Sequence, residues 1–166
     1  AIEKLPQYLE NAVSYDWPEL RHSLGDHGSL FVLGRGPSYA ISNEAALKFK
    51  ETCQIHAGSY SSAEVLHGPV SIVEPGYPVL ALASRDASED SIASVVDELT
   101  QKGAVTFISS DRAEYAKRLD FAKTSHPLTD PLALIVSFYA FIERLSVERG
   151  INPDLPRNLK KVTETV

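Results

Sequence analysis

The chain has 166 residues, of which 43% are hydrophobic and 23% are charged, and its formal net charge at pH 7 is −6. This length and composition predict one globular unit that can bury a hydrophobic core of its own. Nucleic acid is not expected as a partner, because the 16 lysine and arginine residues are scattered and form no basic stripe for a polyanion.

Membrane, secreted and metal-binding classes are also disfavoured. No apolar run approaches the roughly 20 residues of a membrane span, and the N-terminus lacks a signal-peptide pattern. The single cysteine, Cys53, cannot form an internal disulfide, which is typical of a reducing cytoplasm. Dispersed histidines offer no zinc-ligand spacing and no carboxylate cluster suggests an oxygen cage, so we expect a cytoplasmic protein with no metal and no cofactor.

Helical periodicity alternates along the chain with short buried strands. The first half of the sequence predicts helices over 2–14 and 17–24, with Asp16 as the start signal just before the second. It then predicts a strand over 29–34, a helix over about 38–53, an irregular loop, and a short helix near 61–66. The second half predicts a strand over 77–84, a helix over 88–102, a strand over 104–109, a short helix over 112–119, an edge strand over 121–124, and a helix over 130–149 with Asp130 as its N-cap. Repeated units of this kind predict a three-layer α/β/α fold, doubly wound around a mainly parallel sheet.

The chain divides into three parts. Residues 1–27 are predicted to be a helical lead-in or linker, 28–150 the domain, and 151–166 a C-terminal tail. Pro153 and Pro156 predict that the tail runs extended across the surface. The chain has no methionine, not even an initiator, so we expect a fragment, a processed product or an incomplete sequence.

The helix over 38–53 has two different faces. At about 100° per residue, Glu44, Lys48 and Glu51 fall within roughly 60° of one another. The opposite side, which is directed at the core, carries Ile41, Ala45, Phe49 and Cys53. The charged stripe is either a solvated ion pair from Glu44 to Lys48, which stabilises by a few tenths of a kcal/mol, or part of an active site.

A glycine-containing turn joins the strand over 29–34 to this helix. It contains Gly34, Arg35, Gly36 and Ser38, which we expect to bind substrate, because such a turn presents backbone N–H groups and a positive helix end to an anion. A dinucleotide is not expected. Tyr39 stands where that motif needs a third small residue, and the second strand ends without an acidic residue.

Three segments occur in the order and at the separations of a known family. They are GRGPSYAISNEAALKFKE (34–51), IHAGSYSSAEVLHGP (55–69) and PRNLKKVTETV (156–166). From Phe31 to Val166 the chain resembles a sugar isomerase (SIS) domain, specifically the second such domain in the isomerase part of glucosamine-6-phosphate synthase and its deaminase relatives. It departs from the family at Gly58, where a glutamate usually follows His-Ala.

The resemblance implies a flavodoxin-like SIS fold and an enzyme that acts on an amino-sugar 6-phosphate, interconverting glucosamine 6-phosphate and fructose 6-phosphate. Moving a proton between adjacent carbons of a sugar needs a positioned base and a second proton carrier. By the resemblance, Glu51 is the base and His67 is the ring-opening residue, which acts in the active site of a neighbouring subunit. Lys161 matches the tail lysine that closes over the substrate, and Lys48 matches a helix lysine near the sugar.

The resemblance also implies partners. The Ser/Thr-rich loop with which the family grips the phosphate is not evident here, so we expect an N-terminal SIS domain in the same protein. The role of His67 and the apolar Leu47 among polar helix residues predict a homodimer. The isomerase half of glutamine–fructose-6-phosphate aminotransferase and a sugar-amine deglycase are alternative enzymes. A sugar-phosphate-sensing regulatory module is the alternative of another class.

Overall fold

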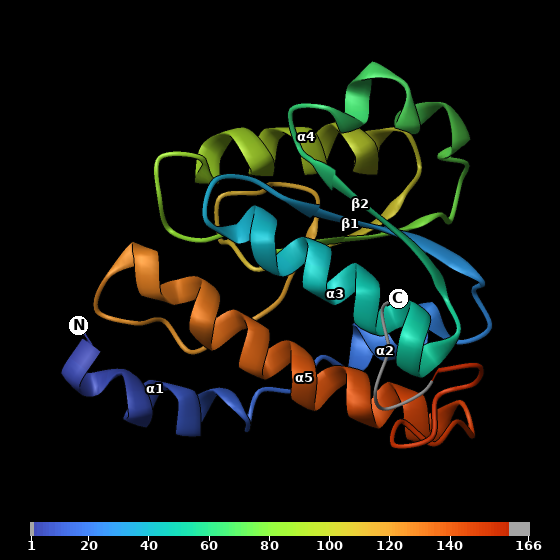
Figure 1. Ribbon diagram of the computed structural model, residues 1–166. Coiled ribbons are helices and arrows are strands. Elements are labelled where there is room, and N and C mark those ends of the chain that lie inside the picture. The colour runs from blue at the N-terminus through green and yellow to red at the C-terminus, as the bar shows by residue number, and fades with distance from the viewer. Residues whose placement is uncertain (1, 160–166) are drawn as a thin grey trace, which may run out of the picture.

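Five parallel strands form the central sheet of the computed structural model, which describes residues 2–159 (Figure 1). The strands are β1 (Ser29–Gly34), β2 (His56–Ser61), β3 (Pro78–Ala81), β4 (Val105–Ile108) and β5 (Lys117–Arg118). Their order across the sheet is β2-β1-β3-β4-β5, and every neighbouring pair runs parallel. The chain therefore extends the sheet to both sides of β1, which confirms the predicted doubly wound α/β fold.

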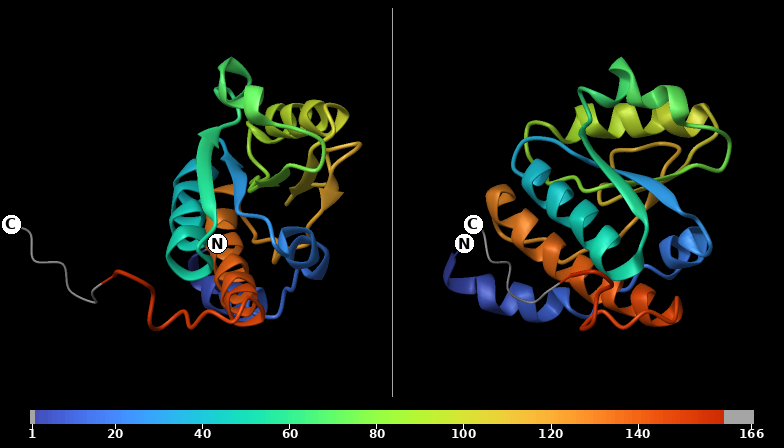
Figure 2. Two further views of the ribbon diagram at one scale, coloured as in Figure 1. Left: turned by 90° about the vertical axis from the view of Figure 1, so that its right-hand side faces the viewer. Right: turned by 45° about the vertical axis from the view of Figure 1, so that its right-hand side comes forward.

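Helices cover both faces of this sheet, as Figure 2 shows from two further sides. They are α1 (Leu5–Ala12), α2 (Pro18–Leu24), α3 (Ser38–Cys53), α4 (Glu89–Gln101) and α5 (Asp130–Glu148), with short 3₁₀ turns η1 (Ile2–Lys4), η2 (Val65–His67), η3 (Pro69–Ile72) and η4 (Pro127–Thr129). The core on one face is shared by α2, α3 and α5, and the core on the other by α4 and the η2 and η3 segment. α1 packs on α5, where the Ser137 hydroxyl donates to the Ala12 carbonyl at 2.8 Å.

The side chains of β1 show why the sheet is buried on both sides. Leu30 and Val32 belong to the core beneath α3 and α5, whereas Phe31 and Leu33 belong to the core beneath α4. Successive strand residues point to opposite faces, so the apolar run LFVL fills both cores. The expected strand and the long helix after it therefore form with the predicted bounds.

The segment after α3 differs from the prediction of an irregular loop, because residues 56–61 form β2. Of its six residues only Ala57 is buried, so the strand lacks the apolar pattern that would reveal it in the sequence. Parallel pairing with β1, from Ser29 opposite His56 to Gly34 opposite Ser61, satisfies its backbone instead. The short helix expected near 61–66 is the 3₁₀ turn η2 at Val65–His67.

The prediction of a helix over 112–119 is wrong. The Asp97 carboxylate on α4 accepts hydrogen bonds from the backbone N–H groups of Glu114, Tyr115 and Ala116, at 2.7, 2.8 and 3.1 Å. A side chain that satisfies three successive backbone donors competes with helix formation. The edge strand is β5 at Lys117–Arg118, and not the predicted segment 121–124.

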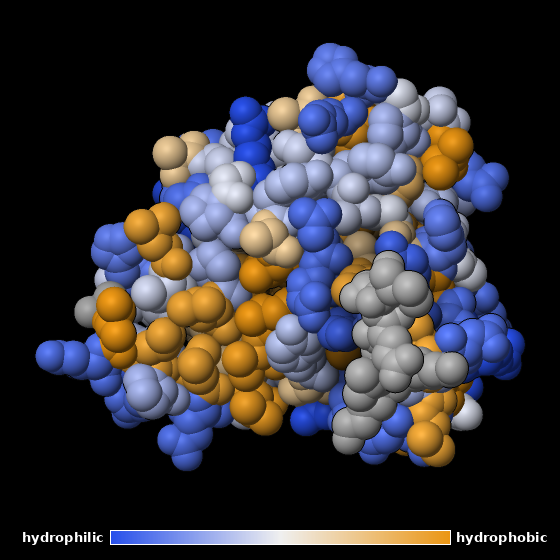
Figure 3. All heavy atoms as spheres, viewed as in Figure 1, coloured by the Kyte–Doolittle hydropathy of each residue, from blue (hydrophilic) through white to orange (hydrophobic). Residues whose placement is uncertain are grey.

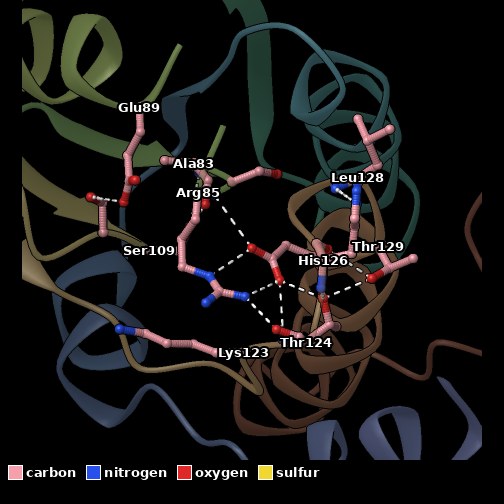
Figure 4. A network of polar contacts seen from close by, with 12 residues as sticks. Ala83, Arg85, Glu89, Ser109, Lys123, Thr124, His126, Leu128 and Thr129 are labelled. Carbon is pink, nitrogen blue, oxygen red and sulfur yellow. Dashed lines mark hydrogen bonds and ion pairs between the residues drawn. The ribbon is translucent and has the colours of Figure 1, made fainter. Parts of the chain in front are cut away.

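Asp130 is fully buried as the first residue of α5, one position after the N-cap place that we expected for it. Arg85, in the segment that follows β3, donates from Nε to Oδ2 at 2.8 Å and from Nη2 to Oδ1 at 2.9 Å (Figure 4). Thr124 donates to Oδ1 from its backbone N–H at 3.0 Å and its hydroxyl at 2.7 Å. Burial alone would raise the pKa of Asp130, but these donors outweigh it and hold the pKa below its ordinary value.

We predict that Asp130→Asn lowers the free energy of unfolding at pH 7 by about 2–4 kcal/mol, because it leaves buried donors without their charged acceptor. A carboxylate with a depressed folded-state pKa stabilises above its unfolded pKa, so the deficit should shrink as the pH falls below about 4. Urea unfolding at pH 7 and pH 3 measures both effects.

Asp120→Asn is the matched control for this substitution, since Asp120 pairs with Arg118 at 2.6 Å and both side chains are exposed. It should cost less than about 1 kcal/mol at either pH. A deficit in Asp130→Asn that stays the same at pH 7 and pH 3 would show that the charge of Asp130 contributes nothing.

Candidate active site

The charged stripe that the sequence predicts on α3 is present, and its closest contact is between Lys48 and Glu51. Lys48 Nζ lies 2.6 Å from Glu51 Oε2 and 3.6 Å from Glu44 Oε1. All three side chains are partly exposed, whereas Ala45 and Phe49 on the opposite side of the helix are fully buried. The hydrogen bond that Lys48 donates to Glu51 raises the pKa of Lys48 above its ordinary value, so the ammonium stays protonated between two carboxylates.

α5 adds a residue to this stripe that the sequence analysis missed. The Tyr139 hydroxyl donates to Glu44 Oε1 at 3.0 Å, across 95 positions of the chain. The pKa of Tyr139 is raised above its ordinary value, mainly by burial and secondly by the hydrogen bond to Glu44. The packing of α5 on α3, where the Phe49 and Phe138 ring centroids are 5.4 Å apart, brings Tyr139 there, and no local pattern reveals it. We call Glu44, Lys48, Glu51 and Tyr139 the charged array.

The array can act as an acid–base site. A carboxylate that is partly exposed can accept a proton from a carbon acid, and an adjacent ammonium can stabilise the negative charge that develops on the substrate. Glu51 can supply the carboxylate and Lys48 the ammonium, and the two groups are 2.6 Å apart, from Nζ to Oε2. Glu44, held by Tyr139, restrains Lys48 from the other side.

The turn of Gly34, Arg35, Gly36 and Ser38 lies at the carboxyl end of β1, as predicted, and its side chains are engaged within the chain. The Ser38 hydroxyl is fully buried and lies 2.5 Å from the Ser84 hydroxyl, in the segment after β3. Arg35 Nη1 donates to the Ser91 hydroxyl of α4 at 2.9 Å. These contacts join the two loops that flank the point where the sheet order reverses, between β1 and β3.

The predicted site residues do not gather in one place within the chain. Glu51 is thirteen residues after Ser38 on α3, which corresponds to about 20 Å along the helix axis. His67 is exposed in η2, which follows the carboxyl end of β2, whereas Glu51 lies in the last turn of α3, shortly before β2 begins. β2 therefore separates the two residues along the chain. Lys161 lies outside the described residues.

The described part of the tail, residues 151–159, contains turns in place of the expected extended course. Arg157 and Asn158 line a shallow hollow of about 340 Å³ together with Lys50, Gln54, Ile55 and His56, at the end of α3. The tail therefore reaches the edge of the sheet at which Glu51 lies. Three of the lining residues, Lys50, His56 and Arg157, carry basic side chains.

At Gly58, where the sequence departs from the family it resembles, a neighbouring ring lies close to the backbone. A Cβ atom at this position would lie 2.9 Å from Cε2 of Tyr60, so the tyrosine ring occupies the space that a longer side chain would need. Tyr60 in turn packs edge-on against Phe31 with ring centroids 5.0 Å apart. A glutamate at position 58 would require this ring to move.

Within 2–159, no group of three or more His, Cys, Asp or Glu residues is arranged to hold a metal ion. None of the described helices is long and apolar enough to cross a bilayer.

The family is shown by comparison with known proteins. The family model described as "SIS domain" matches residues 23–112, which is more than half of the chain. The chain belongs to the SIS domain family. This SIS domain is 35% identical over 165 residues to glutamine–fructose-6-phosphate aminotransferase (isomerizing) of Thermococcus kodakarensis, an alignment that covers 96% of the chain and 27% of the relative.

Solved structures show the same SIS fold. A candidate phosphosugar isomerase from Silicibacter pomeroyi DSS-3 superimposes with a TM-score of 0.87 at 56% identity, covering 92% of this SIS domain and 46% of that chain. The C-terminal domain of glucosamine-fructose-6-phosphate aminotransferase from Francisella tularensis superimposes with a TM-score of 0.81 at 24% identity, covering 90% of this SIS domain and 44% of that chain. The SIS domain thus spans about a quarter of the curated relative and less than half of each solved chain.

The turn between β1 and α3 offers a test of how tightly this SIS domain is built. A Cβ atom at Gly34 would lie 2.7 Å from the Ser38 carbonyl oxygen and 2.9 Å from Tyr39 Cα, both of which are backbone atoms. We predict that Gly34→Ala lowers the free energy of unfolding by about 1–3 kcal/mol, because the helix start must shift. Among the described residues, apart from Gly28 itself and its two chain neighbours, no atom lies within 4 Å of a Cβ at Gly28, so Gly28→Ala should be close to neutral in the same urea titration. Equal effects of the two substitutions would contradict the prediction.

Proposed function

We propose that this SIS domain is the base-carrying half of a phosphosugar isomerase or deaminase that acts on an amino-sugar 6-phosphate, with glucosamine 6-phosphate and fructose 6-phosphate as substrate and product. The observation that supports it most directly is the Lys48–Glu51 contact at 2.6 Å on a partly exposed helix face of an SIS domain. The similarity to an isomerizing aminotransferase and to a candidate phosphosugar isomerase supports the same class of substrate.

In the proposed reaction, the sugar ring opens and Glu51 removes the proton from C2 of the open-chain aldose. The electrons form an enolamine between C1 and C2, and the Lys48 ammonium stabilises the negative charge that develops as the proton leaves. Return of the proton to C1 gives an imine at C2. Addition of water to C2 and departure of ammonia give fructose 6-phosphate, so the reaction needs no oxidant or cofactor.

Three further roles are part of this proposal. His67 opens the ring, and because it lies far from Glu51 within one chain it acts on the site of a neighbouring subunit of a homodimer. Lys161 of the tail closes over the substrate, which is consistent with the course of residues 157–158 past the end of α3. The Gly34–Ser38 turn remains a predicted substrate contact. It lies at the opposite edge of the sheet from Glu51, so within one chain it does not contact the same sugar phosphate as Glu51.

The proposed enzyme needs a second domain. The chain spans 46% of the similar Silicibacter pomeroyi protein and 27% of the similar Thermococcus kodakarensis protein, so both contain long segments outside the match. We propose that an N-terminal SIS domain of the same polypeptide binds the phosphate group. A phosphate held by several donors orients the reacting carbons over the base, and the base-carrying half alone lacks that orientation.

The isomerase half of a glutamine-dependent aminotransferase is a second candidate, favoured by the 35% identity to such a protein. It uses the same base but receives ammonia from a glutaminase domain. Measurement of ammonia release from glucosamine 6-phosphate, with and without glutamine and fructose 6-phosphate, separates the two. A sugar-phosphate sensor would bind the ligand without turnover, and a deglycase would prefer sugar–amine adducts.

We predict that Glu51→Gln in the complete protein abolishes turnover of glucosamine 6-phosphate and changes the free energy of unfolding by less than about 1 kcal/mol, because the side chain is partly exposed and packs little. Steady-state kinetics and urea unfolding measure the two effects. Glu98→Gln is the matched control, since Glu98 forms an i,i+4 pair with Lys102 at 3.2 Å on α4, and it should retain full activity. Unfolding of Glu51→Gln would make Glu51 a structural residue.

We also predict that mixed subunits regain activity. Glu51→Gln and His67→Asn homodimers should each be inactive, and after subunit exchange the mixture should recover up to about a quarter of wild-type activity, because half of the subunits are then in heterodimers with one intact site of two. Activity after exchange, verified by native mass spectrometry, is the measurement. Subunit exchange without recovery of activity would mean that Glu51 and His67 of the same chain act in the same active site.

A further inference from the structure

One oxygen of Glu44 faces two donors that come from different helices. Oε1 of Glu44 accepts the hydroxyl hydrogen of Tyr139 on α5 at 3.0 Å, and the same Oε1 lies 3.6 Å from Lys48 Nζ on α3. Lys48 Nζ lies 2.6 Å from Glu51 Oε2. The ammonium is therefore hydrogen-bonded to Glu51, whereas its distance to Glu44 exceeds the ordinary range of a hydrogen bond.

The α-helix by itself favours the opposite pairing. A glutamate four residues before a lysine pairs with it better than a glutamate that follows, because this order also suits the helix dipole. Glu44 stands four residues before Lys48, and Glu51 follows Lys48 by three residues. Helix spacing alone therefore does not account for the contact between Lys48 and Glu51.

Tyr139 supplies an interaction that does account for it. A carboxylate oxygen that already accepts a hydrogen bond from a phenol is a weaker acceptor for a second donor, and its position is restrained by the first. The raised pKa of Tyr139 keeps its hydroxyl protonated, and hence a donor, at neutral pH. Phe138, the preceding residue of α5, packs on Phe49 of α3, so the core of the domain places Tyr139 beside Glu44.

The surface around Tyr139 is otherwise apolar. Figure 3 shows hydrophobic surface gathered over α5 and α1 on the face that α3 and α5 present. Five exposed or partly exposed side chains on α3, η4 and α5 define the apolar face: Leu47, Leu128, Leu132, Val136 and Tyr139. Tyr139 is the member of this face that carries a polar group, and that group is bonded to the charged array.

The pairing within the array is the strongest local electrostatic influence on Glu51. Within residues 2–159, Lys48 supplies the one cation at ion-pair distance from Glu51, and Glu44 and Glu51 are the two carboxylates at that distance from Lys48. The other charged side chains on segments around this part of α3 pair with neither Lys48 nor Glu51 and are Lys50 on α3, Glu143 on α5, His56 on β2 and Arg157 in the tail. Water screens these more distant charges.

We propose that Tyr139 is a positioning residue for the candidate base, because its hydroxyl occupies Oε1 of Glu44 and thereby leaves the Lys48 ammonium with Glu51. The effect on turnover rests on the proposed function, whereas the effect on Lys48 rests on the geometry of the array alone. An adjacent ammonium favours the ionised form of a carboxylate and stabilises negative charge on a substrate. An ammonium drawn to Glu44 would serve both roles less well.

Intramolecular amide formation tests the effect on Lys48 without requiring turnover. A carbodiimide activates a glutamate side chain, which then forms an amide with a neighbouring lysine amine, with net loss of water. Fragmentation of the peptide that spans residues 44–51 in a mass spectrometer distinguishes the Lys48–Glu44 amide from the Lys48–Glu51 amide. Tyr139→Phe removes only the hydroxyl of a side chain that is 41% exposed, so this variant is expected to fold.

Tyr115→Phe is the matched control. Tyr115 is 51% exposed, and its hydrogen bond to Asp97 comes from the backbone N–H, which phenylalanine retains. We expect Tyr139→Phe to raise the ratio of the Lys48–Glu44 amide to the Lys48–Glu51 amide about threefold or more, and Tyr115→Phe to change it by less than about 1.5-fold. An unchanged ratio in Tyr139→Phe would overturn the proposal, whether or not the protein turns over glucosamine 6-phosphate.

Steady-state kinetics of the complete protein with glucosamine 6-phosphate measure the consequence for turnover. We expect Tyr139→Phe to lower kcat about tenfold with KM changed by less than about twofold, and to move the acidic limb of the kcat/KM profile upward by about half a pH unit. In a Glu44→Ala background, Tyr139→Phe should change kcat by less than about twofold, because the residue through which Tyr139 acts is then absent.

Two kinetic results would contradict the positioning role and leave the proposed function intact. A raised KM at unchanged kcat would make Tyr139 a substrate contact, and equal losses of kcat with and without Glu44 would show that Tyr139 acts independently of it. Conversely, a protein without turnover in which Tyr139→Phe still shifts the amide ratio would support the positioning role and count against the proposed function.

Discussion

The buried carboxylate of Asp130 joins three segments that are remote in the sequence, and much of the candidate site depends on it. Arg85 comes from the loop after β3, Thr124 from the segment before α5, and Asp130 from the start of α5 itself. A carboxylate at a helix start also complements the positive end of the helix dipole. Because Asp130 is fully buried and its pair with Arg85 is bidentate, the pair defines where α5 begins relative to the carboxyl edge of the sheet.

The position of α5 determines which side chains contact α3. With its start held by Arg85, α5 runs along α3, packs Phe138 against Phe49, and brings the Tyr139 hydroxyl to Glu44. The charged array, formed by α3 and α5, then contains two carboxylates, one ammonium and one phenol. A site of this composition is net negative and would repel a phosphate dianion, so the base and the phosphate grip of the proposed enzyme must be separate in space.

The same helix leaves apolar side chains exposed next to the array. α5 uses one side for the core, one flank for α1, and leaves an apolar stripe outward beside the array. A base that works on a carbon acid benefits from exclusion of water, and an apolar surface benefits from burial.

The sequence by itself determined the features that depend on local periodicity. The apolar run of β1, the amphipathic α3 with Lys48 beside Glu51, and the strand–helix alternation that requires a parallel sheet follow from side-chain spacing along one element. Only the tertiary structure decided features that depend on a partner far along the chain. β2 has little apolar pattern and exists because β1 offers it backbone partners, and residues 114–116 avoid a helix because Asp97 binds their N–H groups. Tyr139 meets Glu44 across 95 positions, and the apolar face arises where two helices lie side by side. Such contacts carry no local signature, because their free energy comes from pairing and burial between segments that the sequence separates.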